Sequence, residues 1–182
     1  MSNAYRITDQ SEVYFVTFTV VDWIDVFIKK KYFEIITDSL IFCRKNKGLN
    51  IHAYVIMSNH FHGIFSSSQN SLAYTIRDFK SYTASSIIKL IKDENSIRSK
   101  WILRNFRHNA FKNQRGHDHQ FWMRRNHAKT CESSKFTMEK LNYIHNNPVK
   151  AGYVLKPEHW IYSSAQNYMN NTGVLEIDLF DY

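Results

Sequence analysis

The 182-residue sequence has few of the residues that break or crosslink a chain. It contains two prolines and five glycines, too few for a linker-rich or low-complexity protein. Its two cysteines, Cys43 and Cys131, form no Cys-x-x-Cys pair, which argues against a zinc cluster or a disulfide framework. No apolar run approaches the roughly 18 residues of a membrane span, and the first ten residues lack the apolar core of a signal peptide. We therefore expect a globular, cytoplasmic protein with no membrane partner.

Acidic residues are also scarce relative to basic ones. The chain has 24 Lys and Arg against 16 Asp and Glu, a formal net charge of +8 at pH 7. Basic side chains release the counterions condensed on phosphates, so this excess favours a polyanionic partner such as nucleic acid over a merely basic surface. Aromatic residues make up 15% of the chain. We expect most of them in the core and some stacked on unpaired bases.

Three segments have the alternating or β-branched pattern that is typical of strands: 13–21, 49–57 and 60–65. Between the last two, Ser58-Asn59 predicts a tight turn and therefore a β-hairpin. Residues 121–125 are expected to add a further strand.

Helical spacing of apolar residues predicts helices over 29–46, 72–91 and 136–145. The last is expected to end at Asn146-Asn147-Pro148, because proline disfavours a helical conformation of the residue before it. Residues 92–118 are polar and basic and give no clear pattern.

The predicted order is strand, helix, strand, strand, helix, strand, helix. This order is typical of the ferredoxin-like, split βαβ arrangement. We therefore expect an α+β fold with one antiparallel sheet and helices on one face. Residues 1–182 are expected to form a single domain, with a core over about 13–168 and a C-terminal tail that packs on it.

The first group of candidate site residues is His60-Phe61-His62, within a predicted strand. Residues i and i+2 of a strand point to the same face, so both imidazoles could bind one ion while Phe61 faces the core. Two exposed strand histidines are the alternative. The metallo-β-lactamase pattern HxHxDH fails at Ile64 and Phe65, and the amidohydrolase pattern requires a barrel of about 250 residues.

The second group is Tyr143 with Asn147, four residues apart and therefore on the same helix face. A phenol and an amide oxygen at this spacing could both reach a metal beside the helix. An alternative stays open, with Tyr143 as a packing residue and Asn147 as a helix C-cap.

Together the two groups indicate attack of a tyrosine on a phosphate, assisted by a metal ion. Only a small fraction of tyrosine side chains is ionised at neutral pH, and a nearby divalent cation would offset the cost of forming the anion. The same cation would polarise a phosphate and favour attack by the tyrosine. Two imidazoles and an amide oxygen make a mixed nitrogen and oxygen site that suits Mn²⁺ and, less well, Mg²⁺.

These residues stand within longer motifs. Residues 54–62, YVIMSNHFH, resemble the signature of the HUH-type single-tyrosine transposases, apart from Ser58 where proline is usual. Residues 143–152, YIHNNPVKAG, resemble a segment of their REP-associated tyrosine transposase branch. The block FWMRR at 121–125, and Trp160 with Ser163-Ser164, also match the family. The resemblance covers roughly residues 13–168, and residues 92–120 diverge from it.

The resemblance implies an HUH endonuclease fold that cleaves and rejoins single-stranded DNA, often beside a hairpin. It implies that Tyr143 is the nucleophile and forms a 5′-phosphotyrosine, with no nucleotide cofactor. By position, His60 and His62 become ligands of a divalent metal, Mg²⁺ or Mn²⁺, and Asn147 becomes the third ligand. Many relatives are homodimers, so a homodimer is our expectation for this chain as well.

Basic side chains supply the expected DNA contacts, although each one taken alone could equally be a solvated surface residue. The candidates are Lys80, Arg104, Arg107, Arg124, Arg125 and Lys150. Two other functions stay open at this point: a catalytically inactive protein that binds single-stranded nucleic acid, and a metallohydrolase acting on small phosphoesters. His145 diverges from Tyr143 on the helix and is expected to be structural.

Overall fold

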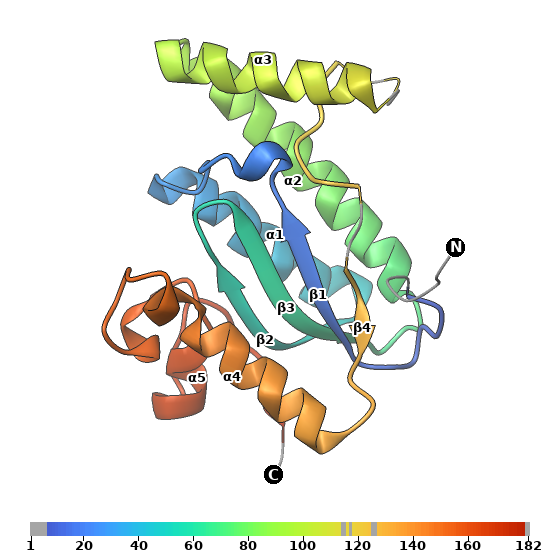
Figure 1. Ribbon diagram of the computed structural model, residues 1–182. Coiled ribbons are helices and arrows are strands. Elements are labelled where there is room, and N and C mark those ends of the chain that lie inside the picture. Colours follow the sequence, from blue (N-terminus) through green and yellow to red (C-terminus); the bar gives the residue numbers. More distant parts are fainter. Residues whose placement is uncertain (1–6, 114–115, 117, 125–126, 181–182) are drawn as a thin grey trace.

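Strands and helices of the described chain form a mixed α/β arrangement in the computed structural model (Figure 1), which describes residues 7–113, 116, 118–124 and 127–180. In chain order the elements are β1 (Tyr14–Thr19), the 3-10 turn η1 (Val21–Trp23), α1 (Lys30–Lys47), β2 (Leu49–Ile56), β3 (His60–Ser67), α2 (Leu72–Glu94), α3 (Ile97–Lys112), β4 (Lys129–Thr130), α4 (Ser134–Lys150), the 3-10 turn η2 (Pro157–His159) and α5 (Ala165–Asn170). Among these residues no helix is both long and apolar enough to cross a lipid bilayer.

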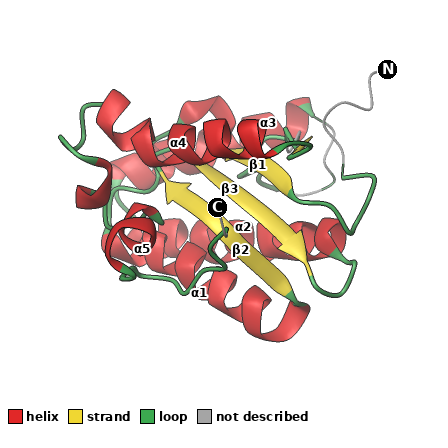
Figure 2. Ribbon diagram, turned by 90° about the horizontal axis from the view of Figure 1, so that it is seen from below, coloured by secondary structure: helices red, strands yellow, loops and turns green. Residues whose placement is uncertain are grey.

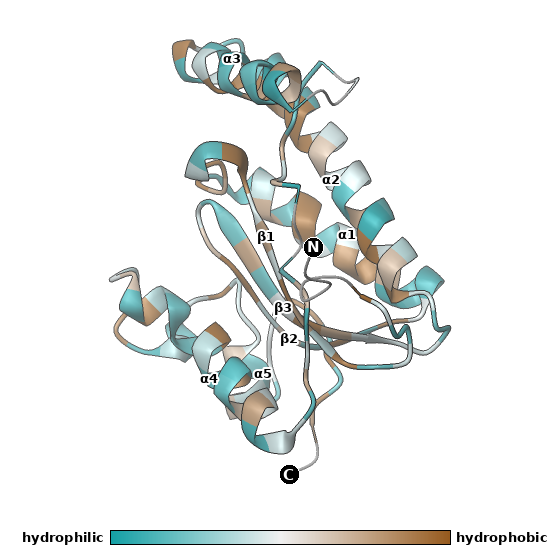
Figure 3. Ribbon diagram, turned by 45° about the vertical axis from the view of Figure 1, so that its right-hand side comes forward, coloured by the Kyte–Doolittle hydropathy of each residue, from teal (hydrophilic) through white to brown (hydrophobic). Residues whose placement is uncertain are grey.

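The four strands form one antiparallel sheet in the order β2-β3-β1-β4. The predicted hairpin joins β2 to β3, and β1 lies on the other side of β3. This register places Thr17 directly opposite His62 and Thr19 directly opposite His60. The hydrophilic end of the hairpin contrasts with the largely hydrophobic body of its strands (Figure 3).

Helices cover both faces of the sheet, so the prediction of helices on one face is wrong. Figure 2 shows the sheet between α1 and α2 on one side and α4 on the other. Phe18 and Phe61 belong to the larger core beneath α1 and α2, whereas Phe15 and Ile64 pack with Ile144 of α4. Successive strand residues point to opposite faces, and here both sets are apolar, so both faces need a cover.

The fourth strand is β4, and the prediction of a strand over 121–125 is wrong for its described residues, 121–124. Within that segment Trp122 makes an isolated bridge to Val20, and the Met123 amide donates to the Thr19 carbonyl. Its indole stacks on Phe27, and its ring nitrogen donates to Thr83. The apolar character of this segment therefore reflects core packing, and its backbone pairs with the chain around the end of β1 only over a few residues.

The stretch without a clear pattern contains α3. Ser96 and Ser99 form a reciprocal capping box at its start, and Ile102 and Phe106 lie four residues apart on its buried face. In the sequence, the serine pair is the feature that indicates the start of this helix. The apolar spacing is hard to recognise because many basic residues lie between the apolar ones.

Helix α4 continues through Pro148 to Lys150, so the prediction that it ends before the proline is wrong. The end lies at Ala151, where Gly152 adopts φ +75°. The Gly152 amide donates to the Val149 carbonyl, and the Tyr153 amide donates to the Pro148 carbonyl. This pattern is a Schellman motif, which requires a left-handed residue and therefore favours glycine. Asn147 thus lies within the helix and is not its C-cap.

Candidate active site

The two histidines of β3 lie side by side on the face covered by α4. Their ring centroids are 4.8 Å apart, while Phe61 between them stacks on Phe18 in the opposite core, with ring centroids 5.6 Å apart. Strand alternation therefore brings the His60 and His62 rings together, as the sequence predicts. His62 is buried, and only 5% of its surface is exposed.

Each imidazole is held through its Nδ1 atom. His60 Nδ1 lies 2.7 Å from Oδ1 of Asn59, and His62 Nδ1 lies 2.8 Å from Oγ1 of Thr17. Because an amide oxygen only accepts, His60 carries its proton on Nδ1 and its lone pair on Nε2. Such partners fix the tautomer and the orientation of metal-binding histidines.

Both histidines are neutral at physiological pH. Burial lowers the pKa of His62 to about 3, and the nearby His60 and Lys140 act in the same direction. Burial also lowers the pKa of His60, against opposing contributions from a hydrogen bond with Asn147 and from Asp25. Desolvation penalises the charged imidazolium, and the neutral form is the one that binds metal ions.

The face of α4 that carries Tyr143 and Asn147 covers the histidine pair. The Tyr143 hydroxyl lies 3.4 Å from Nε2 of His62, and the two rings meet edge to face at 5.1 Å. The Asn147 side chain is a hydrogen-bond partner of His60. The four residues that the sequence singles out therefore meet within one chain.

A cleft of about 520 Å³ opens at this point. It is lined by Phe15, Thr17, Thr19, Trp23, His60, His62, His127, Lys129, Lys140, Tyr143 and Asn147. Its cationic residues are Lys129 and Lys140, and none of the lining residues in the described chain is a carboxylate. The Lys140 ammonium lies 5.6 Å from the centre of the Tyr143 ring and 5.2 Å from that of Phe15. The cleft therefore favours an anion beside the tyrosine hydroxyl.

The donor atoms in the cleft fit a divalent cation that accepts nitrogen and oxygen ligands. His60 and His62 are neutral and are oriented through Nδ1, and Asn147 adds an amide oxygen. Over the described ranges, no three His, Cys, Asp or Glu side chains cluster closely enough to hold a metal. An ion in this cleft would therefore depend on Asn147 and on oxygens from water or substrate.

Two of the predicted DNA-binding lysines lie in different surroundings. The Lys150 ammonium lies 5.8 Å from the centre of the Tyr143 ring, beside the cleft. Lys80, on α2, is half-buried and donates to the Met123 carbonyl, with its ammonium 5.2 Å from the centre of the Phe18 ring. The structure therefore brings Lys150 to the tyrosine and places Lys80 outside the cleft lining.

Three of the predicted arginines lie elsewhere on the surface. Arg104 and Arg107 are exposed on α3, which contacts η1 at the border of the cleft. Arg124 is also exposed. Arg125 lies outside the described residues.

Sequence reasoning did not find seven of the residues that line the cleft, Phe15, Thr17, Thr19, Trp23, His127, Lys129 and Lys140, nor Asn59, which orients His60. Three of them had a signal. Thr17 and Thr19 are the polar residues of the first strand, and Lys140 precedes Tyr143 by three residues and so shares its helix face. The sequence predicts Asn59 only as a turn residue, and the position of Trp23 depends on long-range contacts.

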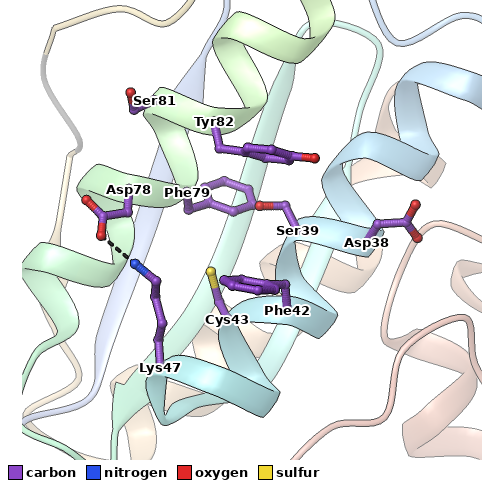
Figure 4. A pocket seen from close by; sticks show the side chains of 9 residues that line it. All are labelled: Asp38, Ser39, Phe42, Cys43, Lys47, Asp78, Phe79, Ser81 and Tyr82. Atoms are coloured by element: carbon purple, nitrogen blue, oxygen red, sulfur yellow. Dashed lines mark hydrogen bonds and ion pairs between the residues drawn. The ribbon is translucent and has the colours of Figure 1, made fainter.

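A larger cavity, of about 720 Å³, lies between α1 and α2 on the opposite side of the sheet (Figure 4). It is lined by a mixture of apolar and polar side chains, and Lys47 and Asp78 form an ion pair across it. Cys43 is its nucleophilic residue, and burial raises the pKa of that thiol to about 11, which keeps it protonated. The larger cavity is therefore not the candidate site. The smaller cleft is, because it brings together a histidine pair, a tyrosine and lysines.

Comparison with known proteins gives a match at the level of structure. A solved structure of a REP-associated tyrosine transposase bound to a REP hairpin is similar to this chain with a TM-score of 0.65. The match covers 100% of this chain and 95% of the other at 16% sequence identity, so the likeness shows a shared fold. The models of known protein families give no match, and neither do the curated proteins.

Proposed function

We propose that this protein cleaves and rejoins single-stranded DNA through a covalent 5′-phosphotyrosine on Tyr143. The observation that supports this most directly is the contact between the Tyr143 hydroxyl and His62, at 3.4 Å. The cleft around them has lysines and, among the residues that the structure describes, no lining carboxylate. A phosphodiester is the anionic substrate that such a nucleophile and such a charge distribution suit.

In the proposed reaction the Tyr143 oxygen attacks a backbone phosphorus and loses its proton. The bond from phosphorus to the 3′ oxygen of the preceding nucleotide breaks, and that oxygen leaves as a 3′-hydroxyl after taking up a proton. The downstream strand is then joined to the protein through its 5′ phosphate. Attack by another 3′-hydroxyl reverses the exchange and releases the tyrosine, so no nucleotide cofactor is needed.

The residues of the cleft have separate roles in this proposal. Thr17 and Asn59 orient the imidazoles of His62 and His60, and Lys140 holds the phosphate beside the Tyr143 hydroxyl through charge. His60, His62 and Asn147 would hold a divalent cation, Mg²⁺ or Mn²⁺. Such a cation, when bound, polarises the phosphate and lowers the cost of ionising the tyrosine.

Two further observations support a DNA substrate with a hairpin. The similar structure is that of a transposase bound to a REP hairpin. The element order and the sheet order β2-β3-β1-β4 are those expected of the ferredoxin-like HUH endonuclease fold. We therefore assign this chain to the REP-associated tyrosine transposases as part of the proposal.

A labelling experiment tests the reaction. A DNA hairpin with single-stranded flanks, labelled at its 3′ end, is incubated with protein and Mn²⁺ and separated on a denaturing gel. The label should move to the protein, whereas a 5′-labelled strand should give a shorter free fragment. Tyr143→Phe should abolish the protein-linked band. His60→Ala should abolish it with an unchanged melting temperature and weakened Mn²⁺ binding, whereas His159→Ala, at an exposed histidine outside the cleft, should retain it.

The other two functions give different results in the same experiment. Tight binding of the hairpin without any protein-linked band would indicate an inactive DNA-binding protein. Turnover of a chromogenic phosphodiester without a protein-linked band would indicate a metallohydrolase. Either result would overturn the proposed strand transfer.

A further inference from the structure

An exposed tryptophan borders the cleft at its His60 end. Trp23 leaves 57% of its surface exposed, although most of its indole is an apolar aromatic surface. Its indole meets the His60 imidazole at 66°, with ring centroids 5.6 Å apart, so the two rings are not stacked. Trp23 also lines the cleft that holds Tyr143. An apolar surface in this position is available to a ligand that enters the cleft.

The backbone beneath Trp23 is strained. Asp22 and Trp23 have φ values of +55° and +54°, in the left-handed region that bulky side chains rarely adopt. Such conformations persist only where the surrounding structure enforces them, and they concentrate at functional sites. The strained turn therefore depends on the contacts that hold it.

Asn59 links this turn directly to the histidine pair. Its Oδ1 accepts from Nδ1 of His60, while its Nδ2 donates to the Trp23 carbonyl at 3.1 Å and to Asp25 at 2.9 Å. Asn109 of α3 donates to the Asp22 carboxylate from the other side. One amide side chain therefore fixes both the orientation of His60 and the position of Trp23.

We propose that Trp23 is a stacking platform for an unpaired nucleobase of the strand that Tyr143 attacks. This inference rests on the proposed function. Lys129 and Lys140 supply positive charge to the cleft for phosphate, and Trp23 supplies an uncharged aromatic surface. A single DNA strand alternates anionic phosphates with flat bases, which suit the lysines and the indole respectively. Base stacking on aromatic side chains is a general mode of single-strand binding. By fixing one base, Trp23 would set which phosphate lies at the tyrosine.

The experiment measures binding in a Tyr143→Phe background, where the strand stays intact. The probe is a fluorescent hairpin with single-stranded flanks, together with a series in which each flank position in turn lacks its base. The variants are Trp23→Gly, which removes the indole and suits the left-handed backbone, and Trp23→Phe, which keeps an aromatic ring. Tyr82→Ala is the control, because Tyr82 is 61% exposed and lines the cavity on the opposite side of the sheet.

We expect Trp23→Gly to raise the dissociation constant about 5- to 150-fold, the range of one base–aromatic contact. Trp23→Phe should retain most of the affinity, and Tyr82→Ala should retain all of it. One missing base in the series should weaken binding to the parent and should have no further effect in Trp23→Gly. Melting temperatures should show that Trp23→Gly is folded.

Unchanged affinity in Trp23→Gly, or a missing-base penalty that persists in it, would overturn the stacking role. If the Tyr143-containing protein still forms its protein-linked band in that case, the proposed function stands and only this inference fails. If the protein binds no single-stranded flank at all and forms no band, both fail.

Discussion

At the scale of single residues, a lysine one turn before the tyrosine gives the cleft much of its charge. The Lys140 ammonium lies over the rings of Phe15, Phe136 and Tyr143. In the part of the chain that the structure describes, no carboxylate forms an ion pair with it. A cation that is not neutralised by the protein is available to an anionic ligand.

We therefore expect Lys140→Ala to slow formation of the protein-linked band about 10- to 100-fold, a loss of roughly 1.4–2.8 kcal/mol of transition-state stabilisation. Lys140→Arg should recover most of the rate, because it keeps the charge. Single-turnover rates measured with the labelled hairpin test this. The matched control is Lys135→Ala, an exposed lysine in the first turns of the same helix. Equal rates in both alanine variants would contradict a role for Lys140.

At the scale of elements, α1 and α2 are tied together by one carboxylate. Glu94, at the end of α2, accepts from Lys29, Lys31 and Tyr32 around the start of α1. Hydrogen bonds from Lys31 lower the pKa of Glu94 most, followed by those from Tyr32 and Lys29, and the value falls to about 2. Glu94 therefore keeps its charge in the folded protein at pH values where it would be protonated in the unfolded chain.

This difference predicts the sign of a pH effect. The folded-state pKa of Glu94 lies below its ordinary value of 4.5, so its contribution to stability is complete above about pH 4.5 and is lost as the pH falls towards about 2. Glu94→Gln should therefore destabilise the protein at pH 7 and flatten the fall in stability below pH 4.5. Urea unfolding of both proteins at pH 7, 4.5 and 3 measures this. If the stability of the two proteins fell in parallel as the pH was lowered, Glu94 would not contribute to the pH dependence of folding.

At the scale of the whole molecule, one chain supplies every residue of the cleft. Tyr143 of α4 and the histidines of β3 lie in contact without a second copy. The expectation of a homodimer stays a prediction, and the site does not depend on it.

Mixing two inactive variants tests whether the tyrosine acts within its own chain. His60→Ala lacks a histidine and Tyr143→Phe lacks the nucleophile, so each should form no protein-linked band. A mixture of the two should also form none if each cleft uses its own tyrosine. Exchange of the tyrosine helix between subunits would instead restore a band in the mixture, on the chain that carries Tyr143.

Local periodicity determined the parts of this protein that the sequence alone could predict. Strand alternation placed His60 and His62 on one face, and the four-residue spacing placed Tyr143 and Asn147 on one face of a helix. Gly48, with φ +60°, caps α1 after Lys47, one residue beyond the end predicted for the helix over 29–46. These features depend on residues close together in the chain, so the geometry of the strand or helix itself decides them.

Tertiary contacts decided the rest. Apolar residues on the second face of the sheet require α4 as a cover, and this packing brings Tyr143 to His62 across 81 positions of sequence. Buried Pro148 remains within α4, although the local preference of proline predicted an end there. Trp23 reaches the cleft because Asn59 and Asn109 hold its turn from distant segments. Periodicity in a sequence carries no information about which faces meet, because that depends on the apolar surface that each face can bury.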